Sequence, residues 1–413
     1  MSHRRARRRS IPLAAILGLA ALVSGTPAAA QTPEGPDPNK VRLQAGPLSM
    51  NPTIALTNIG IDQNVFNQPA DQNPQQDFTL TVTPAAEFWL HMGPTWVTGS
   101  VKEDIIWYQK FTTERAANNM SSVGWKVPLN RLNLGVNASR ASVRDRPGFE
   151  IDTRAQRLET SYDGKVEVRA LARTFFGVTG SRARVDYDQT DVFLGTNLQS
   201  ELNHTTTTAG ILVREQLTPL TAIILGATRS QDRFEYSSLR DSDSTAATAT
   251  ISFDPAALIK GSATFGYRDF EPLSPGVSNF KGTTAKVELT YVALESTRLA
   301  FTFSRDVQYS YDVNQPYFLQ TGFAGSVAQQ IFGPVDVVVR GATASMAYET
   351  RAGAVVQSPD RVDQFQSYGG GVGYHMSRDL RLGVNVDKER RVSDVATRQY
   401  SNLRIGSAVT YGF

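Results

Sequence analysis

The stretch "SNLRIGSAVTYGF", residues 401–413, decides the fold. Its large apolar residues all fall on one parity: Leu403, Ile405, Val409, Tyr411 and Phe413. The residues between them are small or polar: Arg404, Gly406, Ala408, Thr410 and Gly412. A period of two predicts a β-strand with one apolar face and one small or polar face. Chain ends usually fray unless they are held, and a strand that closes a barrel would be held.

The start of the chain has the features of a secretory signal peptide. A basic segment, "MSHRRARRRS", precedes the apolar "IPLAAILGLAALVSG", and Ala28 and Ala30 give the small residues before a cleavage point. The apolar run is shorter than the ~20 residues that a spanning helix needs. We therefore expect residues 1–30 to be a signal peptide and the mature chain to begin at Gln31. The Pro- and Gly-rich residues 31–48 read as an extended periplasmic linker.

Charge and cysteine content narrow the class of protein. Residues 1–30 hold five arginines and no acidic residue, so without them 37 of the 42 basic residues remain against 39 acidic ones. The basicity therefore belongs to the targeting segment and does not indicate nucleic-acid binding. The chain has no cysteine, which excludes disulfides and an N-terminal lipid anchor on cysteine. With no second long apolar run, a membrane protein of this sequence must be a β-barrel.

The rest of the chain alternates apolar and polar residues between two kinds of connector. Eight tight connectors, such as "HMGPT" at 91–95 and "MSRD" at 376–379, interleave with nine longer polar ones, such as "DRPGFEIDT" at 145–153. A strand-pair unit also recurs every 36–49 residues, centred on Gly135, Gly177, Gly226, Gly266, Thr302, Gly341 and Gly383. Seventeen connectors join eighteen strands. The sequence predicts an all-β, transmembrane, antiparallel up-and-down barrel of about 18 strands (16–20) over residues 49–413.

An even strand number with short turns on one side is typical of outer-membrane barrels. We therefore expect the outer membrane of a Gram-negative cell, with both termini in the periplasm. Aromatic residues gather near both kinds of connector, for example Phe176 and Tyr374 at tight turns and Tyr187 and Phe270 at longer loops. This placement predicts interfacial aromatic girdles. Tyr411 and Phe413 resemble the terminal signal that the barrel assembly machinery recognises.

Two short stretches carry a family resemblance. "GIDQNVF", residues 60–66, followed by "VTPAAEF", residues 82–88, resembles the opening of the outer-membrane β-barrel porin 2 family, as does the plan of repeated hairpins. Members are often associated with exopolysaccharide or capsule export. The resemblance implies an outer-membrane conduit, with polysaccharide-export components as partners, and it brings no catalytic residues.

Basic residues recur just after the small residue of the repeat. The candidate ladder consists of Arg140, Arg182, Arg229, Arg268, Arg305, Arg381, Lys388 and Arg404. One interpretation is a basic ladder in the lumen that guides an anionic polymer or solute. A second is that nearby acids neutralise these charges, and a third is that some of them face lipopolysaccharide phosphates. In "FFGVTGSRARVDY", residues 175–187, the apolar parity changes, which predicts a β-bulge near Gly180.

Enzyme chemistry has little support in the sequence. There are only four histidines, of which His204 lies near a longer loop and His91 and His375 lie beside tight turns. We find no nucleophile motif, zinc spacing or phosphate loop, and we expect no catalytic site, metal or cofactor. The prediction is a porin-like channel for exopolysaccharide or anionic solutes, with outer-membrane lipid around it and no nucleic-acid partner. The alternatives are a plugged structural or adhesive barrel and a barrel hydrolase.

Overall fold

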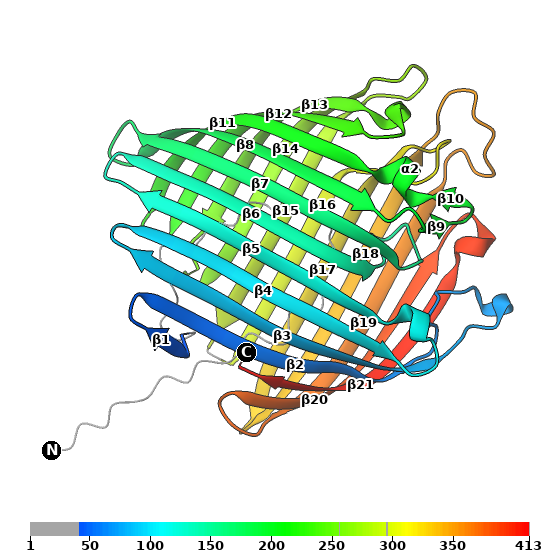
Figure 1. Cartoon of the computed structure of the whole chain (residues 1–413), viewed down its shortest axis with the longest axis horizontal. Helices are drawn as coiled ribbons and strands as arrows, with labels where there is room; N and C mark the ends of the chain where they lie inside the picture. The colour runs from blue at the N-terminus through cyan, green and yellow to red at the C-terminus, as the bar shows by residue number, and fades with distance from the viewer. Residues whose placement is uncertain (1–40, 256, 295, 413) are drawn as a thin grey trace.

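A computed structural model describes residues 41–412 with the exception of residues 256 and 295. Eighteen long antiparallel strands form one closed barrel, because each pairs with its neighbour in sequence and the last, β21, pairs with the first, β2 (Figure 1). This arrangement confirms the predicted up-and-down barrel and its strand number.

The strands are long enough to cross a bilayer when tilted. Their bounds are β2 (Leu48–Asp62), β3 (Asp77–Met92), β4 (Thr95–Tyr108), β5 (Ala116–Pro128), β6 (Leu132–Asp145), β7 (Ala155–Arg169), β8 (Thr174–Tyr187), β11 (His204–Thr218), β12 (Thr221–Phe234), β13 (Ser242–Phe253), β14 (Ile259–Pro272), β15 (Phe280–Ala293), β16 (Thr297–Tyr309), β17 (Tyr317–Phe332), β18 (Val335–Glu349), β19 (Val362–His375), β20 (Leu380–Val392) and β21 (Tyr400–Tyr411). Shorter elements are β1 (Leu43–Ala45), β9 (Val192–Phe193), β10 (Thr196–Asn197), α2 (Leu198–Leu202) and the 3-10 turns Ala70–Gln72, Thr112–Glu114, Ser238–Arg240 and Ala396–Arg398. Among the described residues, no helix is both long and apolar enough to cross a membrane.

The connectors fall at opposite ends of the barrel, as the sequence predicts. The end with the tight turns is called the turn rim here, and the end with the longer connectors is called the loop rim. Gly93 and Gly333 have φ values of 59° and 50°, and each is followed by proline. A positive φ before proline suits a two-residue hairpin turn with glycine in its first central position. At the loop rim, one connector carries β9, β10 and α2 (Figure 1).

Strand alternation gives the barrel an apolar outer wall and a polar inner wall. Directly paired residues point to the same face of a sheet, so contacts inside the barrel fix the parity of every strand. Large exposed side chains such as Val136, Phe265 and Val384 lie on the outer wall. On the inner wall, Arg381 lies directly opposite His375 in the sheet, and Arg404 lies directly opposite Asp387 on one side and Asp62 on the other.

The predicted bulge near Gly180 is wrong. Strand β8 pairs with β7 and β11 without a register shift at this position. The change of apolar parity has another cause, because Val185 and Tyr187 face inward and pack in a hydrophobic cluster under the loops. An apolar residue near the loop rim therefore marks a contact with a loop and not with lipid.

The seam between β2 and β21 closes the barrel. Strand β2 has a bulge here, with Asn58 at a φ of 52° and register shifts against both β3 and β21. Gly60 lies directly opposite Gly406, and a Cβ atom at Gly60 would overlap the carbonyl oxygen of Ile405. Strand β1 pairs with the start of β2, so the sheet begins inside the segment predicted as a linker.

Candidate functional site: a loop across the barrel

The connector between β6 and β7, residues 146–154, folds into the barrel. Gly148 has a φ of 65°, in the left-handed region that favours glycine. Phe149 packs in a hydrophobic cluster on β17, β18 and β19, whose other members are Phe318, Ala344, Met346, Tyr348 and Phe365. The ring centroids of Phe149 and Phe365 lie 4.9 Å apart.

This contact joins opposite walls. In the order of strands around the barrel, at least six strands separate the β6–β7 hairpin from β17–β19 in either direction. Residues 146–154 therefore span the barrel at the loop rim, and we call them the crossbar. A loop in this position limits what can pass through the opening of the barrel at the loop rim, which we call the loop mouth.

Two buried arginines hold the far end of the crossbar. Arg391 Nη1 donates to the carbonyl oxygens of Phe149 and Glu150 at 2.9 and 3.0 Å and lies 3.2 Å from a carboxylate oxygen of Asp152. Arg398 also donates to the Glu150 carbonyl oxygen and lies 3.3 Å from Asp152. Charged groups that leave water need partners, and the contacts of these guanidinium groups with the loop favour its docked conformation.

The Glu150 carboxyl is buried in the middle of this arrangement. Ser310 donates its hydroxyl to Glu150 Oε1 at 2.6 Å, and the Tyr311 backbone N–H donates to Oε2 at 3.3 Å. Burial raises the pKa of Glu150, although the Ser310 hydrogen bond and the nearby charges of Arg398 and Arg361 act in the opposite direction. The crossbar thus carries a titratable group at its docking point.

The near end of the crossbar is tied to neighbouring loops. Arg146 Nη2 and Arg154 Nη1 donate to the Val65 carbonyl oxygen at 2.6 and 3.3 Å. Ile151 packs against the connector between β8 and β11, in a cluster that includes Phe193 and Leu198. Loops that are distant in sequence therefore share one core with the crossbar.

Below the crossbar, the inner wall is made of short polar side chains. Hydroxyl groups on neighbouring strands pair at 2.7–2.8 Å, in the pairs Ser100–Ser122, Ser139–Ser161, Thr208–Ser230 and Thr250–Thr264. On β19 and β20 the inward positions include Gly369, Gly371, Gly373 and Gly383. An eighteen-stranded barrel can enclose an aqueous lumen, and such a wall lines it with many hydrogen-bonding groups.

Three of the eight ladder candidates face the lumen, and each has an acidic partner. Arg268 lies 2.9 Å from Asp306. Arg381 makes a two-pronged contact with Asp336 at 2.6 and 2.7 Å. Arg404 bridges Asp62 at 3.1 Å and Glu389 at 3.2 Å. These contacts fit the interpretation that nearby acids neutralise the lumen charges.

The other five ladder candidates lie on the outer wall: Arg140, Arg182, Arg229, Arg305 and Lys388. Arg182, for example, is directly opposite the exposed Tyr162, and Lys388 is directly opposite the exposed Tyr368. A continuous basic ladder in the lumen is therefore wrong, because in these strands the basic residue has the parity of the lipid-facing side chains.

Sequence reasoning also missed the role of the aromatic residues near the loop rim. Tyr108, Tyr187, Phe234, Phe270 and Tyr311 are buried and support the loops, so they do not form a girdle. The signal that could have revealed the crossbar is Phe149 and Ile151, two large apolar residues in an otherwise polar connector. At the turn rim, Phe176 and Tyr374 are exposed on the outer wall as a girdle requires.

The remaining candidate residues have ordinary surroundings. His204 stacks on Phe234, and its Nδ1 lies 2.7 Å from the Leu202 carbonyl oxygen. Within the described part of the chain, no group of three or more His, Asp or Glu side chains could hold a metal ion. Tyr411 is exposed at the turn end of β21 and pairs with Ile54 and Leu380, whereas Phe413 lies outside the described residues.

A closed barrel with an apolar outer wall, a polar lumen and a loop folded into its mouth defines a porin-like outer-membrane protein. The family model described as "Putative beta-barrel porin 2" matches residues 41–413, and the chain belongs to this family. This match confirms the resemblance read from the sequence. No curated protein sequence matches the chain.

Solved structures from Pseudomonas aeruginosa are similar in fold. OccK2 (OpdF) has 10% sequence identity and a TM-score of 0.46, with 88% of this chain and 98% of that chain covered. The outer membrane protein OpdK has 11% identity and a TM-score of 0.44, with the same coverage. OccK3 (OpdO) has 12% identity and a TM-score of 0.42, with 88% and 95% covered. Similarity at this level carries no argument about solutes.

Proposed function

We propose that this barrel is a channel for hydrated, hydroxyl-rich solutes, with export of a polysaccharide as its biological role. The observation that carries the proposal is the inner wall of paired hydroxyl groups and glycines below the crossbar. Such a wall can exchange hydrogen bonds with a sugar as readily as with water. The anionic alternative is less favoured, because Arg268, Arg381 and Arg404 are all paired with carboxylates.

In this proposal the barrel sits in the outer membrane with its turn rim in the periplasm. The barrel assembly machinery would insert it, and polysaccharide-export components would deliver the polymer to the turn rim. The crossbar would then set the exit from the loop mouth, and export would require it to move aside. No step of bond making or breaking is assigned to the chain.

A plugged barrel is the second candidate, and the crossbar is the observation that favours it. Buried arginines and Phe149 hold residues 146–154 across the mouth, which could make closure permanent. The two candidates differ in whether the crossbar can leave its docked position under native conditions.

Single-channel conductance in a planar bilayer tests both candidates. We would compare the chain from Gln31 onward with a variant in which a short Gly-Ser turn replaces residues 147–153. Steady or flickering steps from the unaltered chain, together with larger steps from the variant, would support the channel. A folded, silent chain with a conducting variant would support the plug, and silence from both folded proteins would overturn the proposed passage.

Liposome-swelling rates then test the solute class. Neutral oligosaccharides of increasing length are expected to enter vesicles that hold the shortened variant, with no advantage for uronic acids of the same size. A strong preference for the uronic acids would instead favour the anionic alternative.

A further inference from the structure

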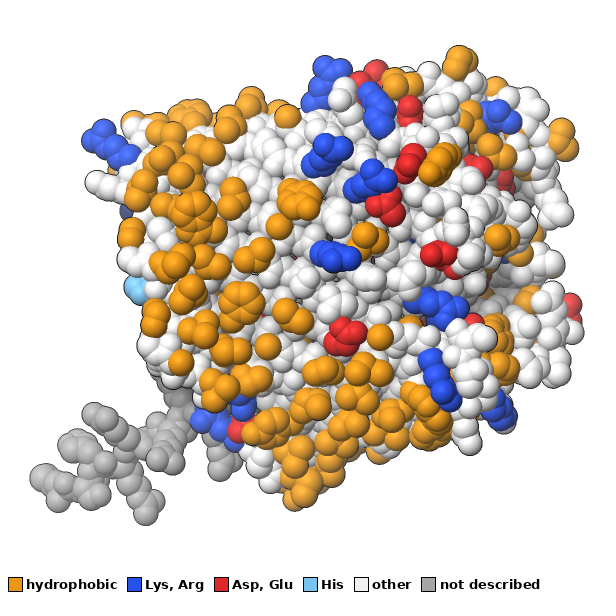
Figure 2. All heavy atoms as spheres, viewed as in Figure 1, with side chains coloured by type: hydrophobic (Ala, Val, Ile, Leu, Met, Phe, Trp, Pro, Cys, Tyr) orange, Lys and Arg blue, Asp and Glu red, His pale blue; other side chains and the backbone are white. Residues whose placement is uncertain are grey.

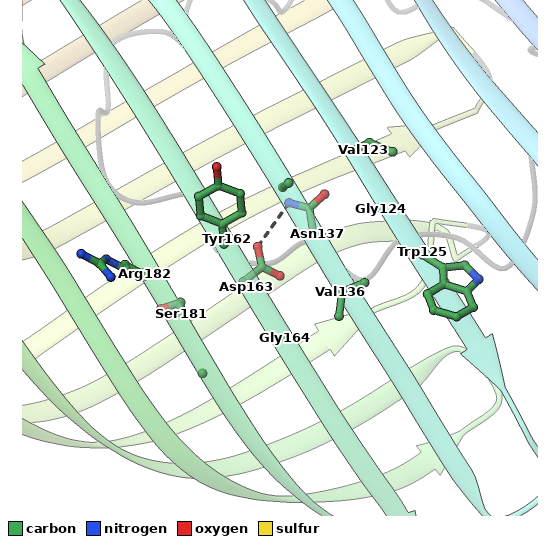
Figure 3. Close-up of a pocket in the computed structure, with 12 residues that line it drawn as sticks. Val123, Gly124, Trp125, Val136, Asn137, Tyr162, Asp163, Gly164, Ser181 and Arg182 are labelled. Carbon is green, nitrogen blue, oxygen red and sulfur yellow. Dashed lines mark hydrogen bonds between the residues drawn. The ribbon is translucent and has the colours of Figure 1, made fainter.

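The outer wall of β5–β8 holds a groove of about 500 Å³ (Figure 3). Its floor is made of small residues on neighbouring strands, namely Ala138, Gly164 and Gly180. A Cβ atom at Gly164 would come no closer than 4.0 Å to Val136, and one at Gly180 would meet nothing within 4 Å. The space above these small residues is therefore empty of protein atoms and accessible from the membrane side of the wall.

Large outward side chains form the walls of this groove. Trp125, Val136 and Tyr162 are each about half exposed or more, at 49%, 53% and 61%. The inward-facing Asn137 and Asp163, joined by the hydrogen bond drawn in Figure 3, line the lumen side of the same strands. The surface offered to the outside is thus apolar, as an acyl chain requires.

A basic residue without an acidic partner lies at the loop-rim side of the groove. Arg182 is exposed, is directly opposite Tyr162, and makes no ion pair within the described part of the chain. Arg140, on β6, is also exposed and unpaired there. Two other outward arginines differ, since Arg184 on β8 pairs with Asp186 and Arg229 on β12 pairs with Asp243.

Figure 2 shows the same pattern on a larger scale. On the face in view, basic side chains lie mainly on the loop-rim side of the hydrophobic area. An unpaired guanidinium at the edge of an apolar membrane-spanning wall is where a lipid phosphate would lie. The groove and its arginine together match the two parts of one lipid molecule.

We propose that this groove binds a phosphorylated glycolipid of the outer leaflet, with an acyl chain between Trp125 and Tyr162 and a phosphate on Arg182 and Arg140. The choice of leaflet rests on the proposed orientation with the loop rim outside. The glycolipid differs from a glycerophospholipid in offering several acyl chains and more than one phosphate, which suits two arginines on strands that flank β7. The site does not depend on the solute that the lumen carries.

Native mass spectrometry of the detergent-solubilised barrel tests this site. The probe is bis-phosphorylated lipid A, compared with its dephosphorylated form and with phosphatidylglycerol. We expect the double variant Arg140→Ala/Arg182→Ala to lose at least tenfold in retained lipid A. Gly180→Leu fills the groove and should reduce retained lipid A by a similar factor. The variant should still fold, because a Cβ atom at Gly180 meets nothing within 4 Å and the position faces lipid. Arg229→Ala, which removes a paired outward arginine, is the matched control and should bind as the unaltered chain does.

Several outcomes would overturn the proposal. These are unchanged lipid A binding in the double variant, an equal loss in Arg229→Ala, equal retention of dephosphorylated lipid A, or tighter retention of phosphatidylglycerol. Conductance of the double variant should equal that of the unaltered chain, so failure of the lipid site and failure of the channel can be told apart.

Discussion

At the scale of single residues, the crossbar is held by side chains that sequence patterns do not normally associate with loops. Arg391 and Arg398 reach from β20 and from the connector after it to the backbone of residues 149–150. Both guanidinium groups also contact Asp152, and Arg391 pairs with Asp363 as well, so each arginine has an acidic partner within the site. Because removing one partner of a buried pair leaves an uncompensated charge, this part of the loop rim tolerates little change.

Phe149→Ala is expected to release the crossbar. Removing a buried phenyl ring typically costs about 3–5 kcal/mol, and here the loss falls on the docked loop and not on the strand ladder. The bond between Arg154 and Ala155 should then become accessible to trypsin, which limited proteolysis of the folded barrel would detect; Arg146 precedes Pro147 and is not a tryptic site. Phe176→Ala, which removes an outward-facing ring of the same size, is the control and should leave the digestion pattern unchanged. Equal protection of both variants would contradict the docking role of Phe149.

Glu150 is expected to make closure depend on pH. The docked carboxyl has a raised pKa and the undocked one has its ordinary value of 4.5, so the protonated form favours docking. Docking is therefore tightest below pH 4.5 and weakens as the pH rises through the raised pKa. A difference of one unit between the two pKa values changes the ratio of docked to undocked loop about tenfold. Conductance should accordingly rise with pH.

The comparison variant for this effect is Glu150→Gln, whose side chain stays neutral. It should keep the crossbar docked and conductance low across the same pH range. Glu235→Gln alters an exposed carboxylate at the loop rim and should keep the pH dependence of the unaltered chain. A pH dependence that survives in Glu150→Gln would show that another group is responsible.

At the scale of strands and connectors, the sequence predicts nearly everything that depends on near neighbours. Alternation and turn residues are local signals, so the eighteen strands and both kinds of connector could be located without a structure. The crossbar could not, because its position depends on contacts between residues some 240 apart in the chain, such as Arg391 with Glu150. The same reason explains why the change of apolar parity at Val185 and Tyr187 was misinterpreted as a bulge. Loops that cover the end of a strand allow apolar residues on its inner face, and these contacts are distant in sequence.

The segment 60–66, which carried the family resemblance, illustrates both kinds of signal. Gly60 allows the close approach at the seam, and Asp62 accepts a hydrogen bond from Asn402 and pairs with Arg404 across it. Val65 offers its carbonyl oxygen to the crossbar. One short motif therefore joins barrel closure to the loop that crosses the mouth.

Gly60→Val is expected to impair closure of the barrel. The added side chain would collide with the backbone of Ile405 on β21, so the last strand could not pair in register. We expect the variant to lose the heat-modifiable band shift that folded barrels show in SDS gels. Gly135→Val adds the same atoms to an inward position with open space and should retain the shift. Normal folding of Gly60→Val would mean that the seam can adjust its spacing.

At the scale of the whole molecule, charge is arranged differently on the two walls of the barrel. Lumen arginines have acidic partners, as in Arg340 with Asp387 at 2.5 Å, whereas Arg140 and Arg182 on the outer wall have none among the residues that the structure describes. A lumen whose charges are paired favours neither sign of ion strongly, and the two arginines without acidic partners face the membrane. The basic residues predicted as one ladder thus fall into two groups, one that lines the lumen and one that faces the membrane.

Arg404→Ala tests this balance within the pore. The substitution leaves Asp62 and Glu389 without their shared cation on the lumen side of the closing seam. In a variant with the shortened crossbar, the reversal potential in a KCl gradient should be close to zero before the substitution and should shift toward cation preference after it. Arg229→Ala removes the same charge from the outer wall, where it cannot act on ions in the lumen, and should leave the reversal potential unchanged. A strong anion preference before any substitution would instead mean that the paired arginines still dominate the pore, and the polymer passing through it would then be acidic.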